Sequence, residues 1–358
     1  MESEAILDGE LGEEIATRRR SHSFSDDYSV QKTNDDATHC KAAAVQLGYY
    51  KDEFLNRFIT EDVIRRDPEI NIGYWARVAS ISTAVDRFVL RHQGKCQIIS
   101  LGCGFDTLYW RQKAAGKHVQ KFVEVDFSSV TARKIKHIMK PGQPNLVEYF
   151  TEKPKDRQHA DLHAGDYHLV GADIRQWNEL ETKLEACGID ANLPTLFLAE
   201  CVFPYISVDA TDKLLKELAE MFQCAVFLNY EQINVTDRFG KIMEENLEHR
   251  NVQLPGFAAC VNEDTHIERF VRNGWKEVKV FDMNEVYNSV LNGETTRIEK
   301  IEKLDEMLLV RQLLLHYALV MAINDRRPTA SAEEGNGHAA AGSLNLFASS
   351  APSSQTPV

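Results

Sequence analysis

The residues best suited to chemistry stand where short apolar runs of the sequence end. Four such runs end in a glycine turn or an acidic side chain: Gly102-Cys103-Gly104, Asp126, Asp173 and Glu200. Continuous apolar runs are typical of buried parallel strands, whose carboxyl ends share one edge of the sheet. Because ligands of open parallel sheets bind in the crevice at that edge, we expect these residues to line one binding site.

The glycine turn and Asp126 narrow the class of ligand. Glycines directly after a first strand let the backbone turn tightly and approach a ligand closely. An acid that ends the next strand, about twenty residues on, can accept hydrogen bonds from both hydroxyls of a ribose. A dinucleotide site needs a third glycine where this chain has Thr107, and Asp106 would repel a diphosphate. A nucleoside without phosphates fits better, and S-adenosylmethionine is such a ligand, so a methyltransferase is favoured over a dehydrogenase.

The other two acidic strand ends fit the same ligand. Asp173 can accept a hydrogen bond from the adenine amino group, and Ile174 can pack against its ring. Glu200 stands over the crevice, where it can bind the α-amino group of the ligand. Each acid alone is more often a turn cap or a solvated residue, but three acids at successive strand ends indicate a shared function.

Helix-like and strand-like patterns alternate through the middle of the chain. Apolar residues recur at three- and four-residue spacing over 72–92, which predicts a helix, and residues 40–59 are also helix-like. Helices at 127–139 and 210–222 follow predicted strands. This β-α-β-α order predicts an α/β fold with a mostly parallel seven-stranded sheet and helices on both faces.

The remaining segments complete the expected organisation. Residues 140–166 are polar and contain prolines, which predicts a loop. Residues 298–309 have a helical pattern. The strand-like runs 276–281 and 316–323 predict an antiparallel edge of the sheet.

Both ends of the chain are expected to be unfolded. Residues 1–36 are acidic and poor in large apolar residues, and residues 324–358 are rich in Ala, Ser, Gly and Pro. A single domain is therefore expected over 37–323. Within the first tail, Arg18-Arg19-Arg20-Ser21 is either a site for a basophilic kinase or a solvated charge run.

Composition excludes several classes of protein. The 358 residues carry a formal charge of −13, which argues against binding to nucleic acid or to an anionic membrane surface. Seven cysteines without a CxxC pair predict reduced thiols and a cytoplasmic or nuclear protein. Neither a signal peptide nor a membrane span is recognisable. The histidines at 159, 163 and 168 lie in and just after the predicted loop and show no helical pattern, so a metal site there is not favoured.

Several motifs, in order along the chain, resemble those of the leucine carboxyl methyltransferase family. The motifs are Glu124-Val125-Asp126-Phe127, Leu198-Ala199-Glu200-Cys201-Val202, Asn229-Tyr230-Glu231-Gln232 and Asp237-Arg238-Phe239-Gly240. The resemblance runs from about residue 40 to residue 323. It implies the class I fold of S-adenosylmethionine-dependent methyltransferases. The helical elements at about 40–60 and 237–273 are either a lid that narrows the site or an ordinary helical cap on the sheet.

The resemblance also implies a function and the residues that perform it. The substrate would be the C-terminal leucine carboxylate of the catalytic subunit of protein phosphatase 2A, and the enzyme a monomer. The implied cofactor-binding residues are Lys41 and Arg77 for the methionine carboxylate, Gly102 behind it, Asp126 for the ribose, Asp173 and Ile174 for the adenine, and Glu200 for the amino group. Arg77 would also orient the acceptor, and Tyr205 would lie near the transferred methyl group.

Methylation of a terminal carboxylate requires little acid–base catalysis by the protein. An α-carboxyl group has a pKa of roughly 3.3–3.7, so it is already ionised at neutral pH and needs no general base. The enzyme has to exclude water and align the carboxylate for in-line displacement. Two alternatives stay open: a carboxyl methyltransferase of a modified tRNA base, disfavoured by the negative charge and by the lack of a repeat extension, and a non-catalytic protein that binds S-adenosylmethionine.

Overall fold

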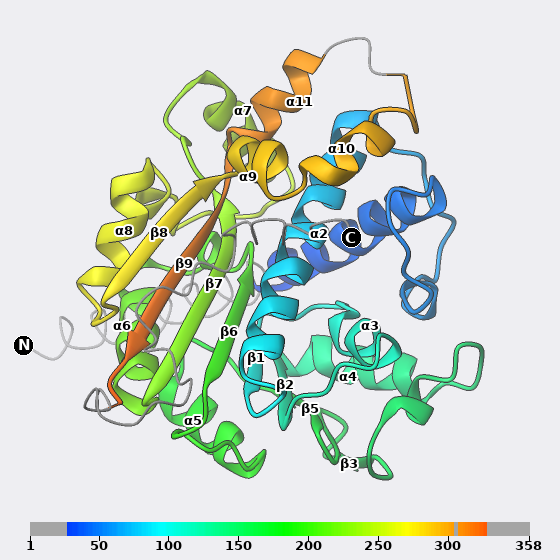
Figure 1. The fold of residues 1–358 in the computed structure, drawn as a ribbon, viewed down its shortest axis with the longest axis vertical. Helices are drawn as coiled ribbons and strands as arrows, with labels where there is room; N and C mark the ends of the chain where they lie inside the picture. The colour runs from blue at the N-terminus through cyan, green and yellow to red at the C-terminus, as the bar shows by residue number, and fades with distance from the viewer. Residues whose placement is uncertain (1–26, 304–306, 328–358) are drawn as a thin grey trace, which may run out of the picture.

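A nine-stranded sheet organises the part of the chain that the computed structural model describes, residues 27–303 and 307–327. The strand order is β3-β4-β5-β2-β1-β6-β7-β9-β8 (Figure 1). The strands are β1 (Gln97–Leu101), β2 (Lys121–Asp126), β3 (Lys155–Arg157), β4 (Asp161–Ala164), β5 (Tyr167–Gly171), β6 (Thr195–Glu200), β7 (Cys224–Gln232), β8 (Glu277–Asp282) and β9 (Tyr317–Asp325). The five central strands β5, β2, β1, β6 and β7 pair in parallel.

The order of the central strands fixes where a ligand can bind. From β1 the chain builds outward through β2 and β5 on one side, and then returns to build β6 and β7 on the other side. The crossover connections therefore diverge beside β1. In an open α/β sheet this divergence leaves a crevice at the carboxyl ends of the strands.

Helices cover both faces of the sheet, and each face has its own apolar core. One core joins the sheet to α2 (Pro68–Arg91), α3 (Leu108–Ala114), α4 (Ser128–Met139), α9 (Met283–Ser289), α10 (Asn292–Ile298) and α11 (Met307–Leu314). The other core joins it to α5 (Trp177–Ala186), α6 (Val208–Met221) and α8 (Glu263–Val271). Every residue of β5 and β7 is buried, which is expected of parallel strands covered by helices on both faces.

The predicted α/β fold is confirmed, with seven strands in the order β5-β2-β1-β6-β7-β9-β8 and an antiparallel edge formed by β9 and β8. The predicted loop over 140–166 is wrong, because it contains the short helix η2 (Leu146–Tyr149) and the strands β3 and β4. These two strands have three and four residues, and all of β3 is exposed. Such short, polar strands carry no alternating apolar pattern that would reveal them.

The ends of the predicted domain and several helix limits also differ. A helix occupies residues 27–46, so the ordered fold includes at least ten residues before the predicted boundary, and the helix stops well before residue 59. At the other end, β9 extends the fold to Asp325. The predicted helix over 298–309 is wrong: α10 ends at Ile298 and α11 begins at Met307. Residues 1–26 and 328–358, including the Arg18–Ser21 motif, lie outside the described residues.

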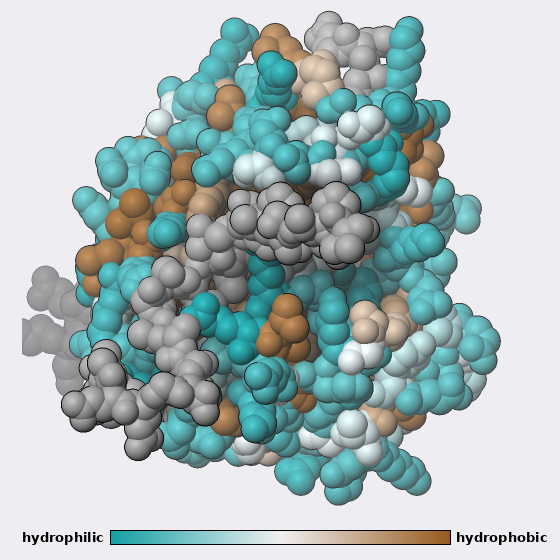
Figure 2. Space-filling view, in the orientation of Figure 1, coloured by the Kyte–Doolittle hydropathy of each residue, from teal (hydrophilic) through white to brown (hydrophobic). Residues whose placement is uncertain are grey.

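The two helices of the predicted 237–273 lid have different positions. Helix α7 (Arg238–Glu248) lies near the carboxyl ends of β6 and β7, together with α9, α10 and α11 at the top of Figure 1. By contrast, α8 packs in the core against the sheet, where Phe270 is fully buried, so this part of the expected 237–273 lid is wrong. Figure 2 shows a mostly hydrophilic face with apolar residues gathered over the edge formed by α8 and β8. No helix in residues 27–303 or 307–327 is long and apolar enough to cross a membrane.

Candidate functional site

The residues predicted for the site come together around one cavity of about 530 Å³. It lies at the carboxyl ends of the central strands. The predicted residues that line it are Lys41, Arg77, Gly102, Asp126, Asp173, Ile174, Glu200 and Tyr205. They come from the 27–46 helix, α2, the turns after β1, β2, β5 and β6, and the short helix η3 (Phe203–Tyr205).

The turn after β1 is held open by its two glycines. Gly102 and Gly104 both have positive φ values, +62° and +49°, which residues other than glycine rarely adopt. A Cβ atom at Gly102 would lie 2.6 Å from Cγ2 of Val202. The backbone therefore turns in contact with the β6 loop, and the N–H of Gly104 is directed at Asp126.

Asp126 is poised to accept hydrogen bonds inside the cavity. Its Oδ2 accepts from the N–H of Gly104 at 2.8 Å, and its Oδ1 accepts from the N–H of Phe127 at 2.8 Å. Burial raises the pKa of the carboxyl group, while these two backbone N–H groups act in the opposite direction. Each oxygen keeps a second lone pair, so the carboxylate can also accept from two hydroxyl groups of a ribose.

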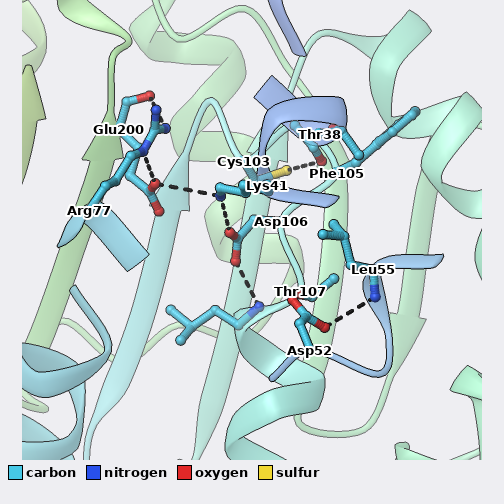
Figure 3. Close-up of polar contacts among 12 residues, drawn as sticks. Thr38, Lys41, Asp52, Leu55, Arg77, Cys103, Phe105, Asp106, Thr107 and Glu200 are labelled. Carbon is cyan, nitrogen blue, oxygen red and sulfur yellow. Dashed lines mark hydrogen bonds and ion pairs between the residues drawn. The ribbon is translucent and has the colours of Figure 1, made fainter. Parts of the chain in front are cut away.

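A chain of alternating charges crosses the other end of the cavity (Figure 3). The Nε of Arg77 donates to Oε2 of Glu200 at 2.7 Å, and Nζ of Lys41 lies 3.7 Å from the same oxygen. Lys41 also donates to Oδ2 of Asp106 at 2.7 Å. Burial tends to raise the pKa of Asp106, but Lys41 and Arg111 hold it well below its usual range. All four charged groups are therefore paired within the wall of the cavity.

Aromatic rings fix the plane of the Arg77 guanidinium. Its central carbon lies 5.1 Å from the ring centre of Tyr230 and 5.8 Å from that of Tyr74. Such cation–π contacts stabilise a charged guanidinium that has lost most of its water. Because the side chain of Arg77 is only 11% exposed, its remaining donors are directed by the protein rather than by solvent.

Asp173 and Ile174 lie as predicted in the turn after β5, but Asp173 has a strong partner. The guanidinium of Arg175 donates to both of its carboxylate oxygens at 2.8 Å and also contacts Asp27 at 2.9–3.0 Å. This clasp joins the adenine end of the predicted site to the first turn of the 27–46 helix. Ile174 is 9% exposed and contributes an apolar surface to the cavity.

Tyr205 is held at the cavity by a short helical turn. Pro204 at the start of η3 fixes the backbone, and the N–H of Tyr205 donates to the carbonyl oxygen of Val202 at 3.1 Å. Burial raises the pKa of Tyr205 to about 12, so its hydroxyl group keeps its proton at neutral pH. The residue can therefore donate a hydrogen bond but cannot act as a base.

The sequence analysis missed the part of the cavity formed by residues 27–37 of the first helix, which were expected to be unfolded. From the first helix, Val30, Asn34 and Ala37 line the cavity, and Oδ1 of Asn34 accepts from the N–H of Phe105 at 2.7 Å. These residues and Lys41 follow one another at spacings of three and four, which is a helical pattern. The acidic composition around them concealed it. Asp106 was treated only as unfavourable to phosphate, whereas it is the main partner of Lys41.

The donor and acceptor groups fit S-adenosylmethionine. Lys41 and Arg77 can bind a carboxylate, and Glu200, which contacts both, can bind an ammonium group. Asp126, in the same cavity wall, can bind a pair of hydroxyls. Carboxylates from Asp106, Asp126 and Asp173 would repel a phosphate. The site therefore suits a zwitterionic nucleoside without phosphates.

Comparisons with known proteins agree with this geometry. The family model described as leucine carboxyl methyltransferase matches residues 29–219. The chain is 51% identical over 331 residues to leucine carboxyl methyltransferase 1 of Caenorhabditis elegans, covering 90% of this chain and 99% of that protein. The Rattus norvegicus protein of the same name is 39% identical over 320 residues, covering 86% and 96%. Human tRNA wybutosine-synthesizing protein 4 is 33% identical over 301 residues, which span 82% of this chain but 44% of that protein.

Proposed function

Because this chain belongs to the leucine carboxyl methyltransferase family and is an S-adenosylmethionine-dependent carboxyl methyltransferase, we propose that its substrate is the C-terminal leucine carboxylate of the protein phosphatase 2A catalytic subunit. The product is the methyl ester of that leucine. We also propose a cytoplasmic or nuclear location, since all seven cysteines are free thiols.

The paired charges in the cavity wall are the observation that carries this proposal. Arg77 pairs with Glu200, and Lys41 pairs with Asp106 and, more distantly, with Glu200. A ligand with one ammonium and one carboxylate group can insert into this arrangement. Its ammonium group then pairs with Glu200, and its carboxylate pairs with Lys41 or Arg77. The protein's ion pairs are then exchanged for equivalent ones, so that no charge is left buried without a partner.

The chain's own residues position the acceptor rather than activate it. S-adenosylmethionine supplies an electrophilic methyl group on a positively charged sulfur. The guanidinium of Arg77 is planar and fixed between rings, so it can orient a second carboxylate through its fork of N–H donors. The protonated hydroxyl of Tyr205 can donate to one acceptor oxygen. Both bonds lower the nucleophilicity of the carboxylate, so their contribution is alignment and the exclusion of water.

Transfer of a labelled methyl group tests the proposal. The protein is incubated with S-adenosylmethionine labelled in its methyl group and with the phosphatase catalytic subunit, and the label is mapped by mass spectrometry. We expect one base-labile methyl ester on the terminal leucine. A phosphatase whose last carboxylate is an amide is the matched control and should stay unlabelled. Label on tRNA, or on neither substrate, would contradict the proposal.

A further inference from the structure

The cavity extends past Arg77 into a region that none of the predicted cofactor contacts occupies. This region is lined by apolar and neutral polar side chains from β7, α7, α11 and β9: Gln232, Phe239, Ile242, Met243, Leu313 and Tyr317. We name these six residues the acceptor region. A chain terminus that ends in leucine would bring an apolar side chain, a carboxylate and a backbone N–H into it.

Gln232 is the unusual member of the acceptor region. It is the last residue of β7, and its side chain is only 4% exposed. Its Oε1 atom is buried and, among residues 27–303 and 307–327, no donor reaches it. Buried amide oxygens are nearly always paired, because losing water without gaining a partner is unfavourable. An unpaired one beside a cavity therefore indicates a donor that arrives with a ligand.

The backbone of Gln232 is fixed by its neighbours in the sheet. Its backbone carbonyl lies 3.1 Å from Nε2 of the buried His266, and its strand neighbour across the sheet is Tyr317. The ring of Tyr317 stacks on Tyr230, with centres 5.4 Å apart and planes 12° apart. The sheet thus fixes the backbone of Gln232, and its side-chain amide interacts with the hydroxyl of Tyr317.

The same face of β7 connects Gln232 to the point where the acceptor carboxylate is expected. Tyr230, two residues earlier, packs against Arg77 at 5.1 Å. Residues two apart in a strand point to the same face and lie roughly 6.6 Å apart. Arg77 and Gln232 also line the same cavity, so a peptide residue whose carboxylate binds Arg77 can direct its own N–H towards Gln232.

We propose that Gln232 accepts a hydrogen bond from the backbone N–H of the acceptor's last residue. This inference rests on the proposed function, because it assumes that the acceptor is a peptide C-terminus. It also gives the site a basis for specificity. A carboxylate on an aspartate or glutamate side chain lacks an N–H in the same relation to it, so its binding would leave Oε1 of Gln232 without a partner.

The matched substrate for a test is a phosphatase catalytic subunit whose last amide is replaced by an ester. The full-length subunit is prepared by ligating a synthetic C-terminal peptide, and a second version carries the ester one linkage earlier. We expect the wild-type protein to lose about tenfold in kcat/KM when the last N–H is absent. The ester at the earlier linkage should have little effect.

The matched variant is Gln232→Met, which keeps the length of the side chain and removes the amide. With the amide substrate it should lose about tenfold in kcat/KM, and the ester should then cause no further loss. Affinity for S-adenosylmethionine should be unchanged. Gln312→Met, on an exposed residue of α11, serves as the control for the chemical change.

Three results would overturn the inference, and they are distinguishable. Equal turnover of the amide and ester substrates by the wild-type protein would show that no hydrogen bond from the last N–H contributes to turnover. If the ester lowers the turnover of Gln232→Met as much as that of the wild type, a group other than Gln232 accepts the hydrogen bond from the last N–H. Absence of methylation of any phosphatase would contradict the proposed function itself and this inference with it. Thermal unfolding checks that Gln232→Met is folded, which we expect because it removes an unpaired buried atom.

Discussion

Two sets of buried ion pairs lie on the strands that flank β1, and they differ in what surrounds them. Lys134 of α4 lies 2.6 Å from Glu124 of β2, and both side chains are at most 1% exposed. The hydroxyl of Tyr167 donates to the same glutamate at 2.6 Å. In the cavity wall, Arg77 pairs with Glu200 at the same close range, but these side chains are 11% and 17% exposed.

The sealed pair and the cavity pairs therefore have different uses. Lys134 and Glu124 have fixed partners, and no ligand can enter between them, so their pairing only offsets the cost of burying two charges. Arg77, Glu200 and Lys41 lie in one open series, so each can exchange a protein partner for a ligand of the same charge. A buried ion pair points to binding when it lines a cavity and shares its atoms with other charges.

Breaking the sealed pair should have the largest effect on stability. Lys134→Met leaves the Glu124 carboxylate buried without a cation, and we expect the free energy of unfolding to fall by about 3–5 kcal/mol. Urea denaturation followed by circular dichroism measures this loss. Adding Glu124→Gln removes the second charge but keeps an acceptor for Tyr167, so the double variant should recover most of the stability. No recovery would show that the pair acts through packing alone.

Breaking a cavity pair should mainly affect binding. Arg77→Ala should abolish methylation and weaken S-adenosylmethionine binding about 100-fold, or ~3 kcal/mol, because the ligand carboxylate loses a charged partner. Its effect on unfolding should be smaller than that of Lys134→Met, since Glu200 keeps Lys41 at 3.7 Å. Isothermal titration calorimetry measures the affinity. Arg77→Lys keeps the positive charge but lacks the planar fork of N–H donors. It should bind S-adenosylmethionine more tightly than Arg77→Ala does. If Arg77→Ala binds S-adenosylmethionine with unaltered affinity and turns over normally, Arg77 has no role in the site.

A buried histidine on β5 should make the stability depend on pH. His168 of β5 is buried beside Lys121, with Nε2 and Nζ 3.2 Å apart, and beside His163. Burial, aided by these neighbours, lowers the pKa of His168 to about 4. As the pH falls from about 6.5 towards 4, the unfolded chain binds a proton that the folded protein does not, so stability falls.

For this histidine we expect a loss of about 2 kcal/mol over that range. His168→Gln should reduce the pH dependence of urea unfolding by this amount, whereas the exposed His159→Gln should leave it unchanged. Equal curves for wild type and His168→Gln would show that other groups control acid sensitivity.

The parts of the fold that the sequence predicted share a physical cause. Strands β1 and β6 are buried between two helical layers, so continuous apolar runs mark their limits. The strands β3 and β4 form a short hairpin at the sheet edge, where His163 lies opposite His168, and their polar residues show no such run. The seven-stranded core was thus predictable, and the two added edge strands were not.

The residues of the site likewise divide into those that a local sequence pattern predicts and those that it does not. Asp126, Asp173 and Glu200 were predictable because each ends a recognisable strand. Lys41 and Arg77 followed only from the family resemblance, since a cation on an amphipathic helix is usually solvated. The partners of these cations and Gln232 depend on contacts between distant segments, such as Lys41 with Asp106, which no local pattern encodes.

The smallest expected effect tests whether the first turns of the 27–46 helix belong to the cofactor side of the cavity. None of residues 27–37 is fully buried, and Asp27 is held by Arg175, whose side chain is 31% exposed. Such a partly exposed pair is worth about 0.2–1 kcal/mol. Asp27→Asn should therefore speed amide hydrogen exchange over 28–34 by up to about fivefold and weaken cofactor binding by no more than that factor. Asp35→Asn removes an outer contact to Arg133, away from Asp173, so faster exchange without weaker binding is expected there. Equal loss of affinity in both variants would mean that the helix as a whole, rather than the clasp at Asp173, controls cofactor binding.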